Sequence, residues 1–435
     1  MGIEWEETTL ADISSDVSYG YTESASDEKV GPRFLRITDI QNGVVNWDNV
    51  PYCPISADNY HKYRLHEGDI VIARTGNSTG ENFLYQGIED AVFASYLIRF
   101  RIDRKKADPR FIWYNLRSRN WWNFIDNSKT GSAQAGANAK ILGRFPLSLP
   151  QLEEQRAIAH ILGTLDDKIE LNRRMNETLE AMTQALFKSW FVDFDPVRAK
   201  AEGRNPGLPK EIADLFPNSF EDSELGDIPK AWRIGSILEQ AELLSGGTPK
   251  TERESYWGGG ILWSSAKDVS QCGQAFLITT DRTITEKGLN ESATQMIPAF
   301  STVVVARGAT TGRMVLFGRA MTMNQTCYAL VSKAETPFVL HCQLRHQMKD
   351  LVHAAHGSVF DTITTSTFNN ARFVLPPGHV LVEFEKQVSP FYRRVLEASN
   401  QSRTLVALRN TLLPKLLSGE VRVGDAEPLV SEAIL

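Results

Sequence analysis

The stretch Phe145-Pro146-Leu147-Ser148-Leu149-Pro150 marks the point at which the chain begins to repeat itself. The run Arg372-Phe373-Val374-Leu375-Pro376 has the same pattern and ends 226 residues later. The pair Gly131-Ser132 recurs as Gly357-Ser358 at the same spacing. A repeat of this size predicts two whole copies of a domain followed by a helix, rather than a stack of short repeats.

Each of these prolines is followed by a long segment in which apolar residues recur in alternating steps of four and three. Adding 226 to the members of the first stripe gives a second stripe of the same kind. The average step of about 3.5 residues is typical of helices that pack as a coiled coil. The predicted spacer positions are Ile158, Leu162, Leu165, Ile169, Asn172, Asn176, Leu179 and Leu186 in the first helix and Val388, Phe391, Val395, Ala398, Ser402, Leu405 and Leu412 in the second.

Both stripes are apolar at their ends and small or polar near the middle, which favours a mutual, antiparallel pair of helices. Asn172 and Asn176 lie near the middle of the first stripe, where polar groups can fix the register of a coiled coil. In an antiparallel pair they would face Ala398 and Ser402. Pro390 is expected to kink the second helix or to delay its start. Two unrelated amphipathic helices, each buried against its own domain, are the alternative.

The chain has 435 residues, which is too long for a single hydrophobic core. The predicted fold class is α+β, with two mixed α/β globular domains in a pseudo-twofold arrangement, separated by two long antiparallel helices that form a coiled coil. A stretch rich in proline, glycine and charge between the copies suits an extended, surface-lying linker. The predicted boundaries are residues 1–150 for the first domain, 151–193 for its helix, 194–231 for the linker, 232–377 for the second domain, 378–419 for its helix and 420–435 for the tail.

Composition indicates an ordinary soluble globular protein, with 42% hydrophobic and 23% charged residues. The acidic start is unlike a secretory leader, and no apolar run has the length of a membrane span. The four cysteines are scattered without paired spacing, which favours a reducing cytoplasm. The formal net charge of −6 argues mildly against a freestanding nucleic-acid binder, although phosphate responds to local charge rather than to the total.

Sequence motifs for catalysis are missing. The chain lacks the G-x-x-x-x-G-K-[ST] phosphate loop, the G-x-G-x-x-G dinucleotide turn and the G-x-S-x-G nucleophile elbow. Cys342 and the neighbouring histidines, among them His341, His346 and His356, do not have metal-binding spacing, which favours ordinary histidines over a zinc site. We therefore expect no catalytic residue and no metal in this chain, and a binding function.

Two short β-branched runs each deliver an arginine into a loop rich in glycine and hydroxyl groups, at residues 69–80 and 302–312. Arginine pairs well with guanine, asparagine and glutamine with adenine, and serine or threonine more flexibly. Either loop alone reads as an ordinary hairpin, but two matching loops favour contact with DNA. The candidate DNA-binding residues are Arg33, Arg36, Arg74, Thr75, Asn77, Ser78, Gln134, Asn138 and Lys140 in the first copy and Lys267, Arg307, Thr310, Thr311, Arg313, Thr364 and Asn369 in the second.

Two further features have simpler interpretations. Arg36–Ile40 and Ser265–Val269 match loosely and are expected to be a repeated strand. The aromatic residues of 113–124 could form a stacking platform for bases. Because Arg117 and Arg119 intervene at helical spacing, a helix packed on the domain core is favoured.

The order of these segments resembles the specificity subunit of type I restriction–modification systems over essentially the whole chain. Leu149–Ile158 (LPQLEEQRAI) and Leu165–Glu170 (LDDKIE) are the most specific pieces and resemble the central conserved region of that family. Ile72–Gly76 and Val305–Ala309 are similar to its recurrent strand and R-x-G element. The second helix departs from the family, because Pro377-Gly378-His379 replaces an acidic start that contains glutamine.

The resemblance implies a non-catalytic reader of double-stranded DNA, in which each domain recognises one half of an asymmetric bipartite site and the helices space the two halves. It also implies two methyltransferase (modification) subunits docked on the helices, and motor-nuclease (restriction) subunits in the full complex. S-adenosylmethionine for adenine methylation, ATP and Mg would then belong to the partner subunits.

Two other classes of function compete with this interpretation. A coiled-coil scaffold with two protein- or carbohydrate-binding domains would have the same organisation. A fused restriction–methylation enzyme is a third possibility. The missing methyl-donor motif and the missing N-P-P-aromatic motif weigh against it.

Overall fold

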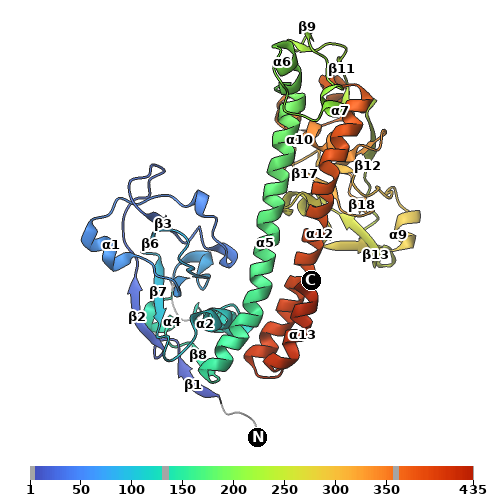
Figure 1. The fold of residues 1–435 in the computed structure, drawn as a ribbon. Helices are drawn as coiled ribbons and strands as arrows, with labels where there is room; N and C mark the ends of the chain where they lie inside the picture. The colour runs from blue at the N-terminus through green and yellow to red at the C-terminus, as the bar shows by residue number, and fades with distance from the viewer. Residues whose placement is uncertain (1–4, 130–136, 356–361, 435) are drawn as a thin grey trace. The chain divides into compact units, whose positions relative to one another are not determined.

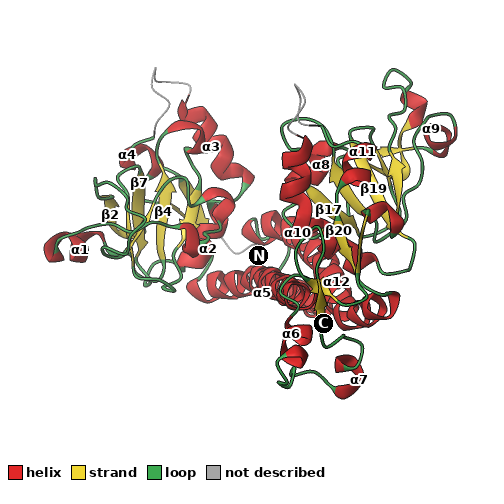
Figure 2. Ribbon diagram, turned by 90° about the horizontal axis from the view of Figure 1, so that it is seen from above, coloured by secondary structure: helices red, strands yellow, loops and turns green. Residues whose placement is uncertain are grey.

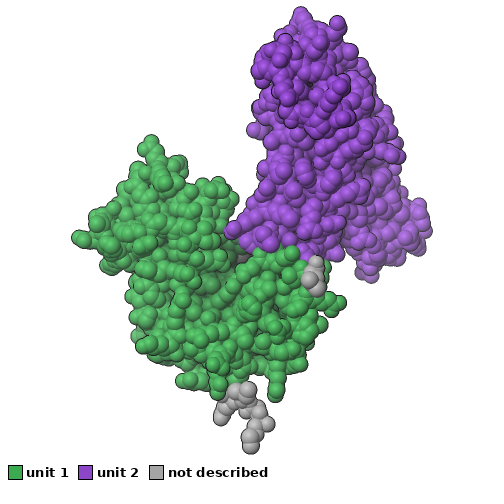
Figure 3. Space-filling view, in the orientation of Figure 1, with its two compact units in different colours: residues 1–169, 404–435 green, residues 170–403 purple. Residues whose placement is uncertain are grey.

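The computed structural model describes residues 5–129, 137–355 and 362–434. The predicted contact Gln134, the two Gly-Ser pairs and His356 lie outside the described residues. The chain forms two compact units, one made of residues 1–169 and 404–435 and the other of residues 170–403 (Figure 3).

The first unit is built on an antiparallel sheet with strand order β2-β7-β4-β5 (Figure 2). Strand β4 is buried along its whole length, which explains the run of apolar and β-branched residues that follows its first residue, Asp69. The strands are β1 (Glu6–Thr9), β2 (Ser14–Tyr19), β3 (Arg33–Leu35), β4 (Asp69–Ala73), β5 (Asn82–Leu84), β6 (Ala91–Phe93), β7 (Leu97–Ile102) and β8 (Pro146–Leu149), and the helices of this domain are α1 (Ala57–Tyr63), α2 (Pro109–Asn115), α3 (Arg119–Lys129) and α4 (Ala139–Leu142).

Helices α2 and α3 bury their aromatic residues against this sheet. Trp113, Tyr114 and Trp121 belong to the same core as Ile70 and Ile98 of the sheet. The packing interpretation of the aromatic stretch is therefore confirmed, and these rings are not free to stack on bases.

The second unit carries a five-stranded sheet with strand order β12-β19-β16-β17-β14 and a three-stranded sheet, β15-β13-β18. Helix α10 packs on the larger sheet through Leu340 and Leu344, which share a core with Val304 and Leu330. The strands are β9 (Phe220–Glu221), β10 (Ile228–Pro229), β11 (Arg233–Gly235), β12 (Ala241–Ser245), β13 (Trp257–Ser264), β14 (Phe276–Leu277), β15 (Arg282–Ile284), β16 (Thr302–Val305), β17 (Met314–Phe317), β18 (Thr322–Met323), β19 (Cys327–Ser332) and β20 (Phe373–Leu375), and the helices are α6 (Asp195–Ala201), α7 (Lys210–Ala213), α8 (Ala266–Gln271), α9 (Glu286–Asn290), α10 (Pro337–Ala355) and α11 (Thr365–Asn370).

The two large sheets share one strand plan. Strand order β2-β7-β4-β5 corresponds to β12-β19-β16-β17, with antiparallel neighbours throughout. Ile70 lies opposite Leu84 in the first sheet, and Thr302 lies opposite Leu316 in the second. Thr302 and Leu316 each lie 232 residues after their counterparts Ile70 and Leu84. The sequence repeat is therefore a repeat of the fold.

The long helices α5 (Leu152–Phe191) and α12 (Gly378–Leu417) have 40 residues each, and both their ends are 226 residues apart. They lie side by side and antiparallel (Figure 1). In the first unit Arg409 donates to Asp166 at 2.6 Å, and in the second unit Asn176 donates to Ser399 at 3.2 Å. Residue numbers thus rise along α5 where they fall along α12, as the matched stripes predict.

Polar residues meet at the centre of this pair. Asn172 is 1% exposed, and its side-chain N–H donates to the Ala398 carbonyl at 3.4 Å, to Gln401 at 3.0 Å and to Ser402 at 3.2 Å. Asn172 thus meets both residues expected opposite the asparagine pair. Asn176 instead meets Ser399, because the helix carries it toward the next turn of α12.

The spacer positions differ in burial. Tyr392, rather than its neighbour Phe391, fills the core position after Val388 and stacks on Phe338 with ring centroids 4.6 Å apart. Buried positions are Ile158, Leu162, Leu165, Asn172, Asn176, Val388, Val395, Ala398, Leu405 and Leu412, and half-buried positions are Ile169, Leu179, Leu186, Phe391 and Ser402.

The expected effect of Pro390 on the helix start was wrong. Helix α12 begins at Gly378 and continues through Pro390. Proline removes one backbone hydrogen bond from the helix. Val388 and Tyr392 are both buried on either side of it, and their packing offsets that loss.

The linker and the tail are more ordered than expected. Residues 194–231 contain helices α6 and α7, and Phe194, Val197 and Phe216 are buried. The expectation of an extended linker was therefore wrong, because its apolar residues pack on the end of α5, while most residues of 201–227 lie at the surface as expected. The tail forms helix α13 (Val423–Ile434), and its Ala426 and Val430 join the core of the first unit.

The expected repeated strand at Arg36 and Ser265 was also wrong. Residues 36–39 form a turn in which Asp39 accepts from the backbone N–H of Arg36 at 2.9 Å. Asp268 accepts from the backbone N–H of Ser265 at 2.8 Å and forms a capping box with Ser265, the N-cap of helix α8. The shared pattern is a short polar residue bonded to the backbone three residues earlier, which competes with strand formation. Among the described residues, no helix is long and apolar enough to cross a membrane.

Candidate nucleic-acid interface

The two glycine-rich segments have the same backbone frame. We call residues 74–81 loop A, which follows β4, and residues 306–313 loop B, which follows β16. Gly76 and Gly80 have φ angles of +70° and +98°, and Gly308 and Gly312 have +99° and +88°. Positive φ is strained for residues with a Cβ, which explains glycine at these four places.

A threonine closes each loop in the same way. Thr79 donates through its hydroxyl to the carbonyl of Gly76 at 2.8 Å, and Thr311 donates to the carbonyl of Gly308 at 2.7 Å. These residues are 232 apart in each case, like the strands that precede them. Thr311, predicted to contact DNA, therefore has a structural bond that its counterpart repeats.

The register of the sheets shows that the two arginines are not equivalent. The backbone N–H of Arg74 donates to the carbonyl of Tyr96 at 3.1 Å, and that of Ala306 donates to the carbonyl of Thr326 at 2.8 Å. Arg74 thus corresponds to Ala306, and Arg307 lies one residue further along. Successive residues of an extended chain point to opposite sides. The expected equivalence of Arg74 and Arg307 was wrong by one residue.

Arg74 lies just beyond the end of strand β4, close to two tyrosine rings. Its guanidinium carbon lies 5.3 Å from the ring centroid of Tyr19 and 5.9 Å from that of Tyr96. Its Nε donates to the carbonyl of Ser95 at 2.9 Å. The Tyr19 hydroxyl accepts a hydrogen bond from the backbone N–H of Ala139 at 3.1 Å. The tyrosines are 44% and 55% exposed, so the group faces solvent.

The other predicted residues of loop A present short polar groups. Asn77 is exposed, and Thr75 and Ser78 are half-buried. Asparagine and hydroxyl side chains can bond to base edges or to phosphate. The predicted contacts of loop A are therefore one arginine and three small polar side chains. The loop ends at Glu81, and Arg313 takes the place of this residue in loop B.

Loop B has a different chemistry on the same frame. Arg307 and Arg313 are exposed, and neither side chain has a hydrogen bond or ion pair with any other described residue. Thr310 accepts from the hydroxyl of Ser270 at 2.7 Å, which ties it to helix α8. Loop B thus presents two free cations where loop A presents one held arginine.

Two predicted contact residues cap helices. Asn138 accepts from the third residue of α4 at 2.9 Å, and Thr364 accepts from the third residue of α11 at 3.3 Å. The two caps are 226 residues apart, and each satisfies a backbone N–H at the start of its helix. Lys140 and Asn369, on the same helices, are exposed.

Three predicted cations already have partners within their domains. Arg36 pairs with Asp39 and Lys267 with Asp281, each at 2.9 Å. Arg33 donates to a backbone carbonyl at 2.6 Å and lies over a tyrosine ring. The structure does not bring these three residues into loop A or loop B.

Ion pairs between strands support the sheet that carries loop A. Arg99 and Asp16 meet at 2.6 Å, and Arg101 and Asp69 at 2.7 Å. Burial alone would raise the pKa of Asp16, but its hydrogen bond with Arg99 and the charge of Arg99 outweigh burial and hold that pKa below its ordinary value. These pairs join the neighbouring strands β2, β7 and β4.

Comparison with known proteins identifies the family. The model of the type I restriction modification DNA specificity domain matches residues 2–181 and 229–393, once in each copy of the repeat. The chain belongs to this family. A HindI specificity subunit of a type I restriction enzyme from Haemophilus influenzae is 26% identical over 96% of this chain and all of its own length. The MjaIX specificity subunit from Methanocaldococcus jannaschii is 25% identical over 82% of this chain and 76% of its own length.

A solved structure has the same fold. The type I restriction–modification S subunit from M. genitalium superposes with a TM-score of 0.63 at 15% identity, covering 95% of this chain and 96% of its own. At this identity the likeness concerns the fold alone.

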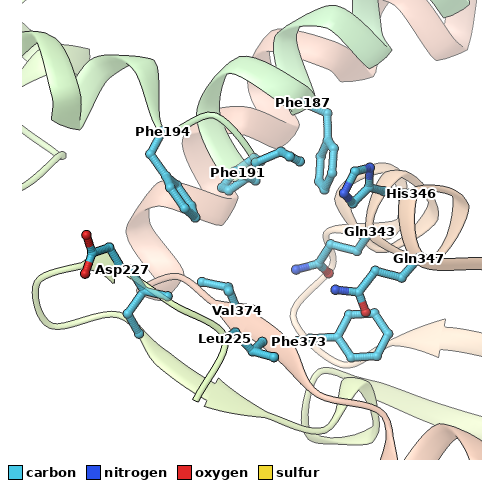
Figure 4. Close-up of a pocket in the computed structure, with 12 residues that line it drawn as sticks. Phe187, Phe191, Phe194, Leu225, Asp227, Gln343, His346, Gln347, Phe373 and Val374 are labelled. Atoms are coloured by element: carbon cyan, nitrogen blue, oxygen red, sulfur yellow. The ribbon is translucent and has the colours of Figure 1, made fainter. Parts of the chain in front are cut away.

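Both specificity domains have a hollow at equivalent places. In the second unit a hollow of about 200 Å³ lies beside Phe191 and Val374, and Gln343 points into it (Figure 4). In the first unit a hollow of about 860 Å³ is lined by Leu417 and Ser148, which are the repeat counterparts of Phe191 and Val374. Neither hollow is lined by loop A or loop B, so both are separate from the candidate DNA interface.

Two of the histidines weighed as metal ligands, His341 and His346, pack inside the second unit. His341 is 2% exposed and lies 3.2 Å from the Thr302 hydroxyl, and burial lowers its pKa to about 3. His346 lies against Phe187. No group of three metal-binding side chains is present in the described parts of the chain.

Sequence reasoning missed Tyr19, Tyr96 and Ser270. Tyr19 ends β2 and Tyr96 precedes β7, and both strands neighbour each other in the sheet that holds β4. The two tyrosines are far from Arg74 in the sequence, and the strand order brings them beside it. A correct sheet order would have been the signal.

Proposed function

We propose that this chain is the sequence-specific DNA-binding subunit of a type I restriction–modification enzyme, in which each specificity domain reads one half of an asymmetric bipartite site. One observation carries the proposal: loops A and B share glycine positions, threonine closure and strand register, but differ in the side chains that they present. Conserved frames with different polar side chains suit two readers of different sequences.

The side chains of the loops have the chemistry of DNA contacts. Loop A offers Arg74, Asn77 and Ser78, and loop B offers Arg307 and Arg313. Phosphate contacts by arginine position a protein on DNA, and contacts with base edges give specificity. The net charge of −6 is compatible with this function, because partners in a complex supply further phosphate contacts.

The helix pair α5 and α12 would space the two readers and dock the partner subunits. The expected partners are two methyltransferase subunits, and motor and nuclease subunits in the full complex. S-adenosylmethionine, ATP and Mg would enter with these partners, and this chain would contribute recognition without catalysis. The complex would work in the cytoplasm.

A binding experiment tests the function. The chain is purified with its methyltransferase partner and mixed with a random double-stranded DNA library, and the retarded DNA is sequenced. The expected result is enrichment of one bipartite motif. A protein-binding or carbohydrate-binding scaffold predicts no sequence enrichment, and that result with an assembled complex would contradict the proposal.

A further inference from the structure

The geometry points to a guanine in the half-site read by the first specificity domain, contacted in the major groove by Arg74. This inference rests on the proposed function and adds the identity of one base. Three observations carry it: the anchored Nε, the two flanking rings and the free outer edge of the guanidinium.

The base of the side chain is fixed at both its backbone and its Nε. The Arg74 N–H donates to Tyr96, and the Arg74 carbonyl accepts from Ala137 at 2.9 Å. The Nε donates to the Ser95 carbonyl at 2.9 Å. A residue with its backbone fixed by two bonds and its side chain by one loses less conformational freedom when it binds, which favours a specific contact over a loose one.

Two tyrosine rings lie beside the guanidinium. Tyr19 and Tyr96 lie 5.3 Å and 5.9 Å from its carbon, within the range of cation–π contacts. The Tyr19 hydroxyl is itself fixed by its bond to the Ala139 N–H. A planar fork held in this way can present two parallel N–H groups in one direction.

The outer edge of the fork has no partner in the described part of the protein. The terminal nitrogens of Arg74 make no hydrogen bond or ion pair with any described residue, and only its Nε is bonded. Two parallel N–H groups match the O6 and N7 acceptors of guanine, which is the commonest specific arginine contact in the major groove. Adenine offers a donor in place of O6, and cytosine and thymine offer no pair of adjacent acceptors there.

The described residues of the second specificity domain do not repeat this group at the equivalent place. Ala306 holds the place of Arg74, and the place of Tyr19 is taken by Ser245, because Tyr19 lies opposite Ile98 as Ser245 lies opposite Tyr328. In loop B, no aromatic ring of a described residue lies within cation–π distance of Arg307. Arg282 of the second domain also lies beside two rings, those of Trp257 and Trp263, but it lies on strand β15 and not in loop B. The place of Arg74 itself is therefore occupied by an arginine in the first domain alone.

A phosphate contact is the competing role for Arg74, and lysine distinguishes the two. Lysine keeps the charge but lacks the planar fork, so Arg74→Lys should preserve a phosphate contact and lose a guanine contact. Arg307→Lys is the matched control, because it makes the same change on the same frame in the other domain.

The experiment compares the wild-type, Arg74→Lys and Arg307→Lys chains, each assembled with the methyltransferase partner, on the random DNA library. We expect Arg74→Lys to reduce the preference for guanine at one position of one half-site by about 5- to 150-fold, and Arg307→Lys to leave that position unchanged. The proposal is overturned if Arg74→Lys keeps the full preference, or if the affected base is not guanine.

A modified base tests the same contact on the wild-type protein and does not depend on a variant that folds. Replacing the guanine by 7-deazaguanine removes the N7 acceptor, while hypoxanthine keeps both major-groove acceptors. We expect about a tenfold loss of affinity for the deaza duplex and no comparable loss for hypoxanthine. Equal binding of all three duplexes would refute the guanine contact. A wild-type complex without any sequence preference would instead refute the proposed function.

Discussion

The carboxylate of Asp166 should be one of the strongest single contributors to the stability of the first unit. It accepts from the guanidinium of Arg409 at 2.6 Å and from the hydroxyl of Tyr114 at 2.7 Å, so it joins α5 to α12 and to α2. The side chains of Asp166 and Arg409 are each 18% exposed. Burial raises the pKa of Tyr114, which keeps its hydroxyl protonated and able to donate.

The magnitude follows from this burial. A hydrogen bond to a charged group contributes about 1.5–3 kcal/mol, and removing one partner of a buried pair costs about 3–5 kcal/mol. Because this pair retains some exposure, Asp166→Ala should lower the free energy of unfolding by about 2–4 kcal/mol. The adjacent Asp167 is the matched control. Its ion pair with Arg110 is also 2.6 Å long, but the two side chains are 63% and 30% exposed, so Asp167→Ala should cost less than about 1 kcal/mol.

The assay is hydrogen exchange followed by mass spectrometry in increasing urea, read on peptides from residues 152–169, which reports unfolding of the first unit. A double-mutant cycle of Asp166→Ala with Arg409→Met should give a coupling of about 1.5–3 kcal/mol. If Asp166→Ala costs no more than Asp167→Ala, or if the cycle shows no coupling, the assignment of Asp166 as a buried junction is refuted.

Three further outcomes are expected. Burial raises the pKa of Glu385 to about 7, although the backbone N–H groups of Phe338 and Val339 in α10 oppose this shift. Glu385 therefore makes the free energy of unfolding fall as the pH rises from about 4.5 to 7. Urea titrations across that range should show a smaller fall for Glu385→Gln, and an unchanged fall would contradict the assignment. Gly80→Ala should destabilise the first unit by about 1–3 kcal/mol in urea, and more than Gly76→Ala, because its Cβ would lie 2.9 Å from Ile125 while that of residue 76 has open space; equal losses would be inconsistent with the clash. Inserting one heptad at matched places in α5 and α12 should lengthen the recognised spacer by about three base pairs in library selection, since seven residues rise about 10.5 Å; an unchanged spacer would argue against the helices as a ruler.

The long helices could be predicted closely from the sequence. Predicted bounds of 151–193 and 378–419 compare with observed bounds of 152–191 and 378–417. The 3.5-residue period and the flanking prolines act locally, so no knowledge of the tertiary fold is needed to recognise them. The burial of Phe194 and Phe216 in the linker depends on a surface that only the folded α5 provides, and composition alone could not reveal it.

The candidate site was less accessible from the sequence. The repeated motif aligned Arg74 with Arg307 in the sequence. Hydrogen bonds between strands that are distant in the sequence show that Arg74 corresponds to Ala306, one residue earlier. Asn138 and Thr364 have side chains equally suited to a base edge and to a helix start. Only the position of the following helix shows that they are caps.

The central claim is that one repeated frame carries two different readers. The most direct measurement maps methylated adenines by single-molecule sequencing in a host without other methylation that expresses this chain with its methyltransferase partner. The account predicts a single asymmetric motif of two specific halves with a fixed unspecific spacer. Arg74→Ala should alter one half only, and Arg307→Ala combined with Arg313→Ala should alter the other half only. A symmetric or ungapped motif, or a change in the same half from both variants, would contradict it.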